Sequence, residues 1–287
     1  MRILILGKDG QLGQSLIKEG KKTGTYVKGY SRIELDITSK NAVDKILTLI
    51  KPNIIINTAA YHVVPDCEIN ADKAFQVNAI ALKNLALISK SNAIKFITIS
   101  SDYVFDGKKN KPYREDDKTN PLQIYGISKN AGELITLNYN PDSIIIRTCG
   151  LYGGLTGSKS KKGNFVLSII SADKNHSSLE VSSDLYANPT YSSDLASAIF
   201  QLLLDTQNKG IYHLASEGYC SMAEFAQKIA EYANLTIKII PVKNRISAED
   251  FKRSKFSVLS NTRARKIGIV LPSWEKSLKK YMEFLKY

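Results

Sequence analysis

Residues 3–13 read ILILGKDGQLG, an apolar run followed directly by three glycines at three-residue spacing. The apolar run predicts a strand buried on both faces, and the residues from Gln11 onward have helical periodicity. Between a strand and a helix, Gly7 permits a tight turn, Gly10 lets an anionic group approach the backbone, and Gly13 allows close helix–strand packing. The segment therefore predicts a dinucleotide-binding loop whose pyrophosphate rests on the helix N-terminus.

The same alternation of short apolar runs and helical stretches continues through the first half of the chain. The expected strands are Ile3–Leu6, Thr25–Lys28, Ile54–Asn57, Phe96–Ser100 and Ile144–Arg147. The expected helices are Gln11–Lys21, Lys40–Lys51, Ala71–Ser91 and Tyr125–Tyr139. Strand–helix alternation with short connections predicts an α/β fold, a doubly wound parallel sheet of the Rossmann type with helices on both faces.

The second half of the chain has a looser pattern. A Gly-, Ser- and Lys-rich stretch over residues 153–163 predicts a loop, and Pro241 is expected to end the apolar run Ile237–Ile240. Helices are expected at Ser192–Leu204, Met222–Asn234 and Trp274–Leu285. We therefore predict a dinucleotide-binding domain over residues 1–150. A smaller α/β, substrate-binding lobe is expected over residues 151–287, with some segments returning to the first domain.

Composition restricts the class of protein. The 287 residues are 43% hydrophobic and 23% charged, as is usual for a folded globular chain. No apolar run approaches the roughly 20 residues that span a bilayer, so no membrane partner is expected. The three cysteines are widely spaced and have no neighbouring histidine cluster. They fit neither a disulfide framework nor a zinc site and predict reduced thiols in a cytoplasmic protein.

The chain is basic, with 40 Lys and Arg against 27 Asp and Glu and a formal net charge of +13. A basic chain can attract nucleic acid, an acidic membrane surface or a phosphorylated small molecule. Here the basic residues are scattered and lack the aromatic–basic pattern of an RNA-binding sheet, so no nucleic-acid partner is expected. Most of them are typical of a solvated surface, while the basic C-terminal part favours an anionic small molecule.

The type of dinucleotide is indicated where the second expected strand ends. An acidic residue at this point would bind the ribose 2′-hydroxyl of NAD and repel a 2′-phosphate. The chain instead reads Tyr30-Ser31-Arg32, a hydroxyl and a guanidinium that suit a phosphate. We therefore predict NADPH as the cofactor, with NADH as the alternative.

Three residues form a candidate catalytic set. Ser101 follows the fourth expected strand, at the carboxyl edge where open α/β sheets hold their ligands. Tyr125 and Lys129 are four residues apart at the start of a helix and so share one face. The ammonium of Lys129 would lower the pKa of the Tyr125 phenol and make it a usable proton donor. A Tyr–Lys pair alone is common on helix surfaces, but with the loop and a strand-terminal serine it predicts carbonyl reduction.

These elements together resemble the extended short-chain dehydrogenase/reductase superfamily and, within it, the dTDP-4-dehydrorhamnose reductase family. The resemblance rests on segments that follow the family's order over nearly the whole chain: Asn57–Ala60 (NTAA), Ile99–Gly107 (ISSDYVFDG), Pro121–Glu133 (PLQIYGISKNAGE), Arg147–Gly153 (RTCGLYG), Asn188–Tyr191 (NPTY) and Gly210–Ala215 (GIYHLA). Several positions depart from the family pattern. Ser101 stands where the family usually has Thr, and Gly150 where it commonly has Trp. His62 stands where the family more often has Thr, Pro65 where it more often has no proline, and Ser254 where it has Pro after Arg253.

The resemblance implies a role for each residue that matches a family motif. It implies catalysis by Ser101, Tyr125 and Lys129, with the last two also touching the cofactor. The other implied cofactor contacts, besides Ser31 and Arg32, are Gly7, Gly10, Gln11, Leu12, Asp36, Ile37, Ala59, Ala60 and Tyr61. Asp102 and Tyr103 would face the sugar, and Asn164 and Arg253 the nucleotide part of the substrate. Gln14 occupies a position that some members use for a divalent metal, and no metal site is expected.

The implied function is NADPH-dependent reduction of the C4 keto group of a nucleotide-linked sugar, dTDP-4-dehydro-L-rhamnose to dTDP-L-rhamnose. Two alternatives stay open: a reductase of a different nucleotide-linked 4-keto-hexose, and a non-catalytic NADP-binding regulatory subunit. A dehydratase is disfavoured because Asp102 is followed by Tyr103, whereas dehydratases commonly have an Asp-Glu pair. The expected partner is the nucleotide sugar, and a homodimer is left open.

Overall fold

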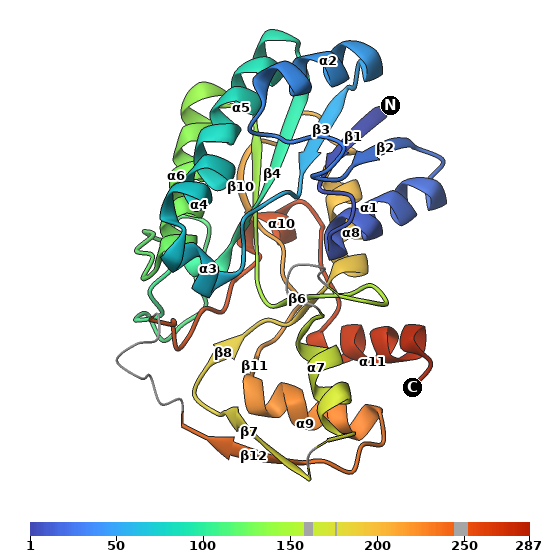
Figure 1. Ribbon diagram of the computed structural model, residues 1–287, viewed down its shortest axis with the longest axis vertical. Helices are drawn as coiled ribbons and strands as arrows, with labels where there is room; N and C mark the ends of the chain where they lie inside the picture. The colour runs from blue at the N-terminus through green and yellow to red at the C-terminus, as the bar shows by residue number, and fades with distance from the viewer. Residues whose placement is uncertain (158–162, 176, 244–251) are drawn as a thin grey trace.

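The structure is a computed structural model that describes residues 1–157, 163–175, 177–243 and 252–287. Its centre is a six-stranded sheet with the order β10-β5-β4-β3-β1-β2 (Figure 1). The strands are β1 (Arg2–Leu6), β2 (Tyr26–Tyr30), β3 (Ile54–Asn57), β4 (Lys95–Ser101), β5 (Ile144–Thr148) and β10 (Gly210–His213). Every pair of neighbours is parallel, which confirms the predicted doubly wound fold.

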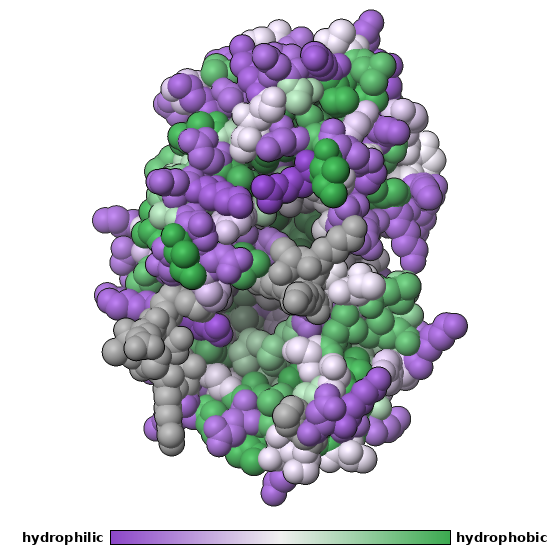
Figure 2. Space-filling view, in the orientation of Figure 1, coloured by the Kyte–Doolittle hydropathy of each residue, from purple (hydrophilic) through white to green (hydrophobic). Residues whose placement is uncertain are grey.

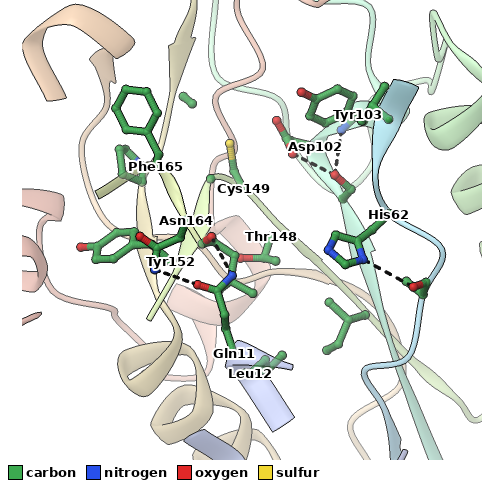
Figure 3. Close-up of a pocket in the computed structure, with 18 of the residues that line it drawn as sticks. Gln11, Leu12, His62, Asp102, Tyr103, Thr148, Cys149, Tyr152, Asn164 and Phe165 are labelled. Atoms are coloured by element: carbon green, nitrogen blue, oxygen red, sulfur yellow. Dashed lines mark hydrogen bonds between the residues drawn. The ribbon is translucent and has the colours of Figure 1, made fainter. Parts of the chain in front are cut away.

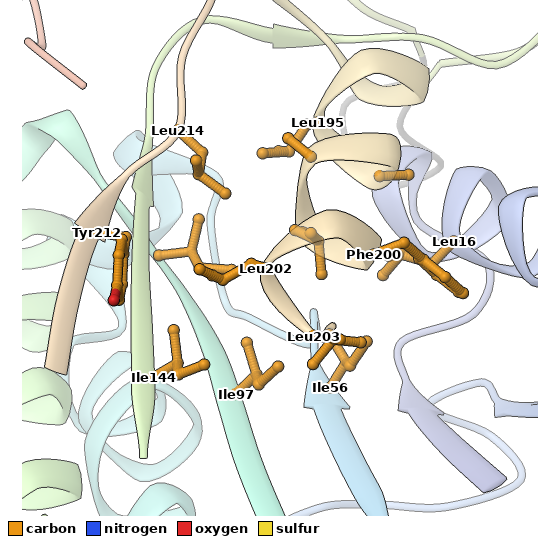
Figure 4. Packing of buried hydrophobic residues seen from close by; sticks show 14 of the residues in the cluster. Leu16, Ile56, Ile97, Ile144, Leu195, Phe200, Leu202, Leu203, Tyr212 and Leu214 are labelled. Carbon is orange, nitrogen blue, oxygen red and sulfur yellow. The ribbon is translucent and has the colours of Figure 1, made fainter. Parts of the chain in front are cut away.

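Isoleucine-rich runs form this sheet because both of its faces are buried. Alternate side chains such as Ile3, Ile97 and Ile144 pack on one face, in a cluster with α1 (Gln11–Lys22) and α8 (Ser192–Leu202). Figure 4 shows this packing between the strands and α8. The intervening side chains, Leu4 and Phe96 among them, pack in a second cluster on the opposite face.

That opposite face is covered by α2 (Lys40–Ile50), α5 (Ala81–Ser91) and α6 (Ile124–Tyr139). Side chains cap two of these helices where they begin. Ser39 accepts a hydrogen bond from the Ala42 amide at α2, and Gln123 accepts one from the Gly126 amide at α6. The second cap fixes the start of the helix that carries Tyr125 and Lys129.

The prediction of a single helix over Ala71–Ser91 is wrong. The segment divides into α4 (Ala71–Phe75), a π-helical turn η1 (Gln76–Ile80) and α5. Within the turn, the side-chain Nδ2 of Asn78 donates to the Tyr61 carbonyl at 2.8 Å and to Ser128 Oγ at 3.0 Å. Its Oδ1 accepts a hydrogen bond from the backbone amide of Tyr61 at 2.9 Å. These contacts account for the wide turn, because they hold Asn78 between α6 and the segment after β3.

The remaining elements lie beside the sheet or form a second group below it (Figure 1). They are α3 (Val64–Ile69), η2 (Asp102–Val104), β6 (Leu151–Tyr152), α7 (Phe165–Ala172), β7 (Ser178–Ser182), β8 (Tyr186–Ala187), β9 (Thr190–Tyr191), β11 (Cys220–Ser221), α9 (Met222–Tyr232), β12 (Lys238–Val242), α10 (Thr262–Lys266) and α11 (Trp274–Leu285). α3 and α10 lie beside the sheet, whereas α7, α9 and α11 share a hydrophobic cluster of their own.

Pro241 does not end its strand as expected, because it lies inside β12. β12 pairs only with β7 in a two-stranded sheet, so one edge of each strand has no partner strand. Proline lacks a backbone N–H, and such an edge position tolerates it because no hydrogen bond to a neighbouring strand is required there. The segments after residue 150 also supply α8 and β10 to the first sheet. The boundary at residue 150 stays a prediction.

The structure also shows the state of the cysteines and the character of the helices. All three cysteines, Cys67, Cys149 and Cys220, are buried free thiols. Across the described residues, no helix combines the length and the apolar character that crossing a membrane requires.

Candidate active site

A cavity of about 370 Å³ opens between the sheet and the lower group of elements. Figure 2 shows the molecule hollowed at this level. The lining comes from the start of α1, the carboxyl ends of β4 and β5, the start of α6, and α7 and α9. Since β1 lies between β2 and β3, the chain reverses its winding beside this edge, where open α/β sheets bind ligands.

The glycine loop has the shape that a dinucleotide needs. Gly7 has φ +90°, and a Cβ added there would lie 2.8 Å from Thr58 Oγ1. Gly10 is the N-cap of α1 and provides no side chain, so the first-turn amides face the cavity beside Gln11 and Leu12. The N-terminus of α1 thus fits an anionic pyrophosphate.

A carboxylate lies at the end of β2 that the sequence reasoning missed. Glu34 Oε2 accepts a hydrogen bond from the Ser31 amide at 2.7 Å, and Glu34 Oε1 pairs with Lys8 Nζ at 2.6 Å. The Ser31 hydroxyl accepts from the Glu34 amide, so Ser-x-x-Glu forms a reciprocal pair like a capping box. The Ser-x-x-Glu spacing is the feature of the sequence from which this pair could have been predicted. The Lys8 hydrogen bond lowers the pKa of Glu34 to about 2, while Arg32 is exposed.

The other cofactor candidates lie along the same edge. Ala60 lines the cavity beside Ala59. The backbone of Tyr61 is held by Asn78. The exposed Asp36 accepts hydrogen bonds from the Thr38 amide and hydroxyl, which lower its pKa, and Ile37 is buried among the side chains behind the sheet.

Ser101, Tyr125 and Lys129 all line the cavity, as the sequence predicts. Ser101 Oγ donates to Asp102 Oδ1 at 2.9 Å and accepts from the Tyr103 amide at 3.2 Å. The ring of Tyr125 meets that of Tyr103 edge to face, with centroids 5.7 Å apart. One strand, β4, and one helix, α6, therefore present one hydroxyl, one phenol and one ammonium to the same space.

Burial controls the ionisation of the catalytic candidates. It raises the pKa of the Tyr125 phenol, and the hydrogen bond with Ser101 acts in the opposite direction. Burial also lowers the pKa of Lys129 to about 8, against the effect of the Glu133 carboxylate. Glu133 is itself held by a forked pair with Arg147, at 2.9 and 2.7 Å, and by Ser100. Lys129 Nζ donates to the Ile99 carbonyl at 2.6 Å, so its ammonium is fixed by β4.

Asp102 is only 4% exposed, and burial raises the pKa of its carboxyl group. Hydrogen bonds with Ser257, Cys149 and Ser101 partly offset that effect. Ser257 and Cys149 lie far from Asp102 in the sequence, and no local pattern marks them as its partners. The carboxyl group is therefore held in place beside Ser101 before any ligand arrives.

Asn164 lines the cavity but is occupied by the protein. Its Nδ2 donates to Gln11 Oε1 at 3.1 Å (Figure 3). The same Nδ2 donates to Tyr281 Oη at 3.1 Å, and the Oδ1 caps α7. The amide thus joins the glycine loop to the lower elements. Arg253 is exposed, and its charge lowers the pKa of Tyr103, which burial raises to about 12.

The lower wall of the cavity is apolar, with Phe165, Met222 and Phe225 among its residues. Gly150 lies in this lining with φ +54°, and a Cβ there would be 3.2 Å from Pro189 Cα. A large side chain at this position would require the backbone to change. No group of three His, Cys, Asp or Glu side chains suited to a metal ion occurs among the described residues.

Comparisons with known proteins cover this whole arrangement. The family model for the RmlD substrate binding domain matches residues 1–286. The spore coat polysaccharide biosynthesis protein SpsK of Bacillus subtilis is 36% identical over 282 residues, which are 98% of this chain and 97% of that protein.

Two solved structures extend the likeness to three dimensions. A dTDP-4-dehydrorhamnose reductase of Clostridium acetobutylicum superposes with a TM-score of 0.93 at 36% identity and covers 100% of both chains. The dTDP-4-dehydrorhamnose reductase of Bacillus anthracis, solved in complex with NADP, has a TM-score of 0.92 at 35% identity and covers 100% of this chain and 99% of its own.

Proposed function

The chain belongs to the dTDP-4-dehydrorhamnose reductase family, and from this premise we propose that it reduces dTDP-4-dehydro-L-rhamnose to dTDP-L-rhamnose with NADPH. Membership makes it an NAD(P)H-dependent oxidoreductase that acts on the keto group of a nucleotide sugar. The observation that supports the finer statement best is the shared cavity. It presents Ser101, Tyr125 and Lys129 at one point and the N-terminus of α1 at another.

The residues present fit the cofactor. Gly10, Gln11 and Leu12 would hold the pyrophosphate at the start of α1, where the open amides favour anions. Arg32 supplies positive charge near the end of β2, where the 2′-phosphate of NADPH would lie, and Lys8 is held there in an ion pair with Glu34. When bound, NADPH supplies a hydride for the carbonyl carbon.

Tyr125 would give its phenolic proton to the carbonyl oxygen as negative charge develops there. Its raised pKa keeps the phenol protonated at neutral pH, so the residue starts the reaction as an acid. The Ser101 hydroxyl, which donates to Asp102 in this structure, would instead donate its hydrogen bond to the substrate carbonyl oxygen. General acid assistance of this kind contributes about 10²–10⁴ in rate. The Lys129 ammonium lines the same cavity and adds a positive charge there while it is protonated.

A second candidate keeps the reaction and changes the sugar. Gly150 leaves this point of the cavity wall without a large side chain, and a wall that differs in this way favours a different 4-keto sugar. Asp102 and Tyr103 would face either sugar, so the two candidates differ only in the substrate that fits. The regulatory-subunit alternative is disfavoured because all three catalytic candidates line one cavity.

The test measures consumption of NADPH by the purified protein with dTDP-4-dehydro-L-rhamnose and, separately, with other nucleotide-linked 4-keto-hexoses. The proposal expects the highest kcat/KM with the rhamnose precursor and release of dTDP-L-rhamnose. A higher kcat/KM with another 4-keto sugar favours the second candidate. Absence of turnover with every such substrate, in a protein that binds NADPH, favours the regulatory alternative.

A further inference from the structure

The hydroxyl of Thr148 has no hydrogen-bond partner among the residues that the structure describes. Thr148 is the last residue of β5, is 7% exposed and lines the cavity. Buried hydroxyls in native proteins almost always have a partner, and an isolated one is destabilising. A buried, unpartnered hydroxyl on the wall of a ligand cavity therefore indicates a bond that a ligand completes.

The strand places this side chain on the dinucleotide side of the cavity. Ile144 and Ile146 of β5 pack in the same cluster as Leu12 of α1. Because side chains alternate along a strand, Thr148 points to that same face, at the edge where α1 begins. Figure 3 shows Thr148 in the cavity wall close to Gln11 and Leu12.

Thr148 also adjoins the catalytic candidates. It is in register with Ser101 on the neighbouring parallel strand, so the two side chains leave the sheet on one face. Across this edge the strands follow the order β1-β3-β4-β5, so Thr148 lies one strand beyond Ser101, at the far end of a dinucleotide that extends from the start of α1. The sugar candidates Asp102 and Tyr103 follow β4 in the turn η2.

We infer that the Thr148 hydroxyl anchors the nicotinamide end of the cofactor by a hydrogen bond to the ring carboxamide. The inference rests on the proposed function. A carboxamide carries both a donor and an acceptor, and a hydroxyl can serve either. The bond would fix the rotation of the ring and so the face that it turns toward the carbonyl. Thr148 is thus a positioning residue that acts on the cofactor, beside the proton donor Tyr125.

The test compares Thr148→Val, which keeps the branched shape and removes the hydroxyl, with wild type. Dissociation constants are measured by titration for NADPH and for 2′-phospho-ADP-ribose, which has the same nucleotide and no nicotinamide. We expect NADPH to bind about three- to tenfold more weakly, the scale of one neutral hydrogen bond, and 2′-phospho-ADP-ribose to bind equally well. Thr148→Ser keeps the hydroxyl and should retain the wild-type affinity for NADPH.

Thr136→Val is a matched control, because the Thr136 hydroxyl is also buried and without a partner among the described residues but lies outside the cavity. It should change neither dissociation constant. Thr148→Ala provides a second hydroxyl-free variant should Val disturb packing, and thermal melting checks the fold of each.

Three results would overturn the inference: an unchanged NADPH affinity in Thr148→Val, an equal loss for both nucleotides, or a rise confined to KM for the sugar. The proposed function fails separately, through a wild type that binds NADPH and reduces no 4-keto sugar nucleotide.

Discussion

The ammonium of Lys129 lies 2.6 Å from the carbonyl oxygen of Ile99 and donates a hydrogen bond to it. Lys129 sits on α6 and Ile99 on β4, so this bond ties the catalytic helix to the central sheet. The lysine is only 4% exposed, and its burial brings its pKa to about 8. Its charge therefore disappears within the pH range of an ordinary assay.

A fall in turnover on the alkaline side is the first prediction. Below pH 8 Lys129 carries its charge, and above that pH the charge is lost, so kcat should decrease as pH rises through about 8. Glu133→Gln removes the carboxylate that raises the pKa of Lys129, so its alkaline limb should move to lower pH. The measurement is kcat at saturating NADPH and sugar. A limb near the ordinary lysine pKa, unmoved in Glu133→Gln, would contradict the assignment.

Tyr125→Phe should lower kcat by at least about 10²-fold, the contribution of a general acid, because it removes the transferable proton. NADPH affinity and melting temperature should stay near wild type, since the ring and its edge-to-face contact with Tyr103 remain. Single-turnover reduction is the measurement, and Tyr103→Phe is the paired variant. Undiminished turnover in Tyr125→Phe would remove this residue from the mechanism.

Cofactor preference should respond in opposite directions to Arg32 and Glu34. Arg32→Ala removes a positive charge near the expected 2′-phosphate and should weaken NADPH more than NADH. Glu34→Gln removes a carboxylate held beside Ser31 and Lys8, and should strengthen NADPH relative to NADH. Titration of each variant with both dinucleotides gives the ratio. Parallel changes for the two cofactors would show that neither side chain distinguishes them.

Acid sensitivity should arise in part from His213. The ring is fully buried, its Nδ1 lies 3.1 Å from the Tyr113 carbonyl, and its Nε2 lies 3.4 Å from Arg147 Nη1. Burial and the Arg147 charge lower the pKa of His213 to about 3. The unfolded chain takes up this proton below pH 6.5 while the folded protein does not, so stability is lost as pH falls from 6.5 toward 3.

His213→Gln removes this titration. Between pH 7 and pH 5 the wild type should lose about 2 kcal/mol more of its free energy of unfolding than the variant. Urea denaturation at the two pH values is the measurement. Because only the change between the two pH values is compared, any constant cost of the substitution cancels. An identical pH dependence in both proteins would show that His213 takes up its proton in the folded protein as readily as in the unfolded chain.

The sheet was predictable because its strands are buried on both faces. Runs such as Ile54–Asn57 and Ile144–Arg147 have no polar alternative to the interior, and the observed strands match them to within a residue. The π-helical turn at Asn78 was not predictable, since contacts with Tyr61 and Ser128 from distant segments produce it. The short strand β10 likewise depends on its partner β5 more than on its own four residues.

The candidate site divides in the same way. Ser101, Tyr125 and Lys129 could be predicted because each lies in a local motif, beside a strand end or a helix start. The partners of Asp102 could not, because Cys149 and Ser257 reach it from segments that only the fold brings together. The roles of Ser101, Tyr125 and Lys129 in the reaction stay predictions.

The position of β10 in the sheet has a consequence for biosynthesis. Residues 210–213 pair with β5, whose own residues end at Thr148, and α8 covers one face of the same sheet. A ribosome therefore releases β5 long before its neighbour exists, with one edge unpaired and without the α8 side chains that cover one face. Such an edge invites pairing with other chains, as exposed edges of parallel sheets do. The nascent chain therefore carries an unpaired strand edge until β10 has been translated.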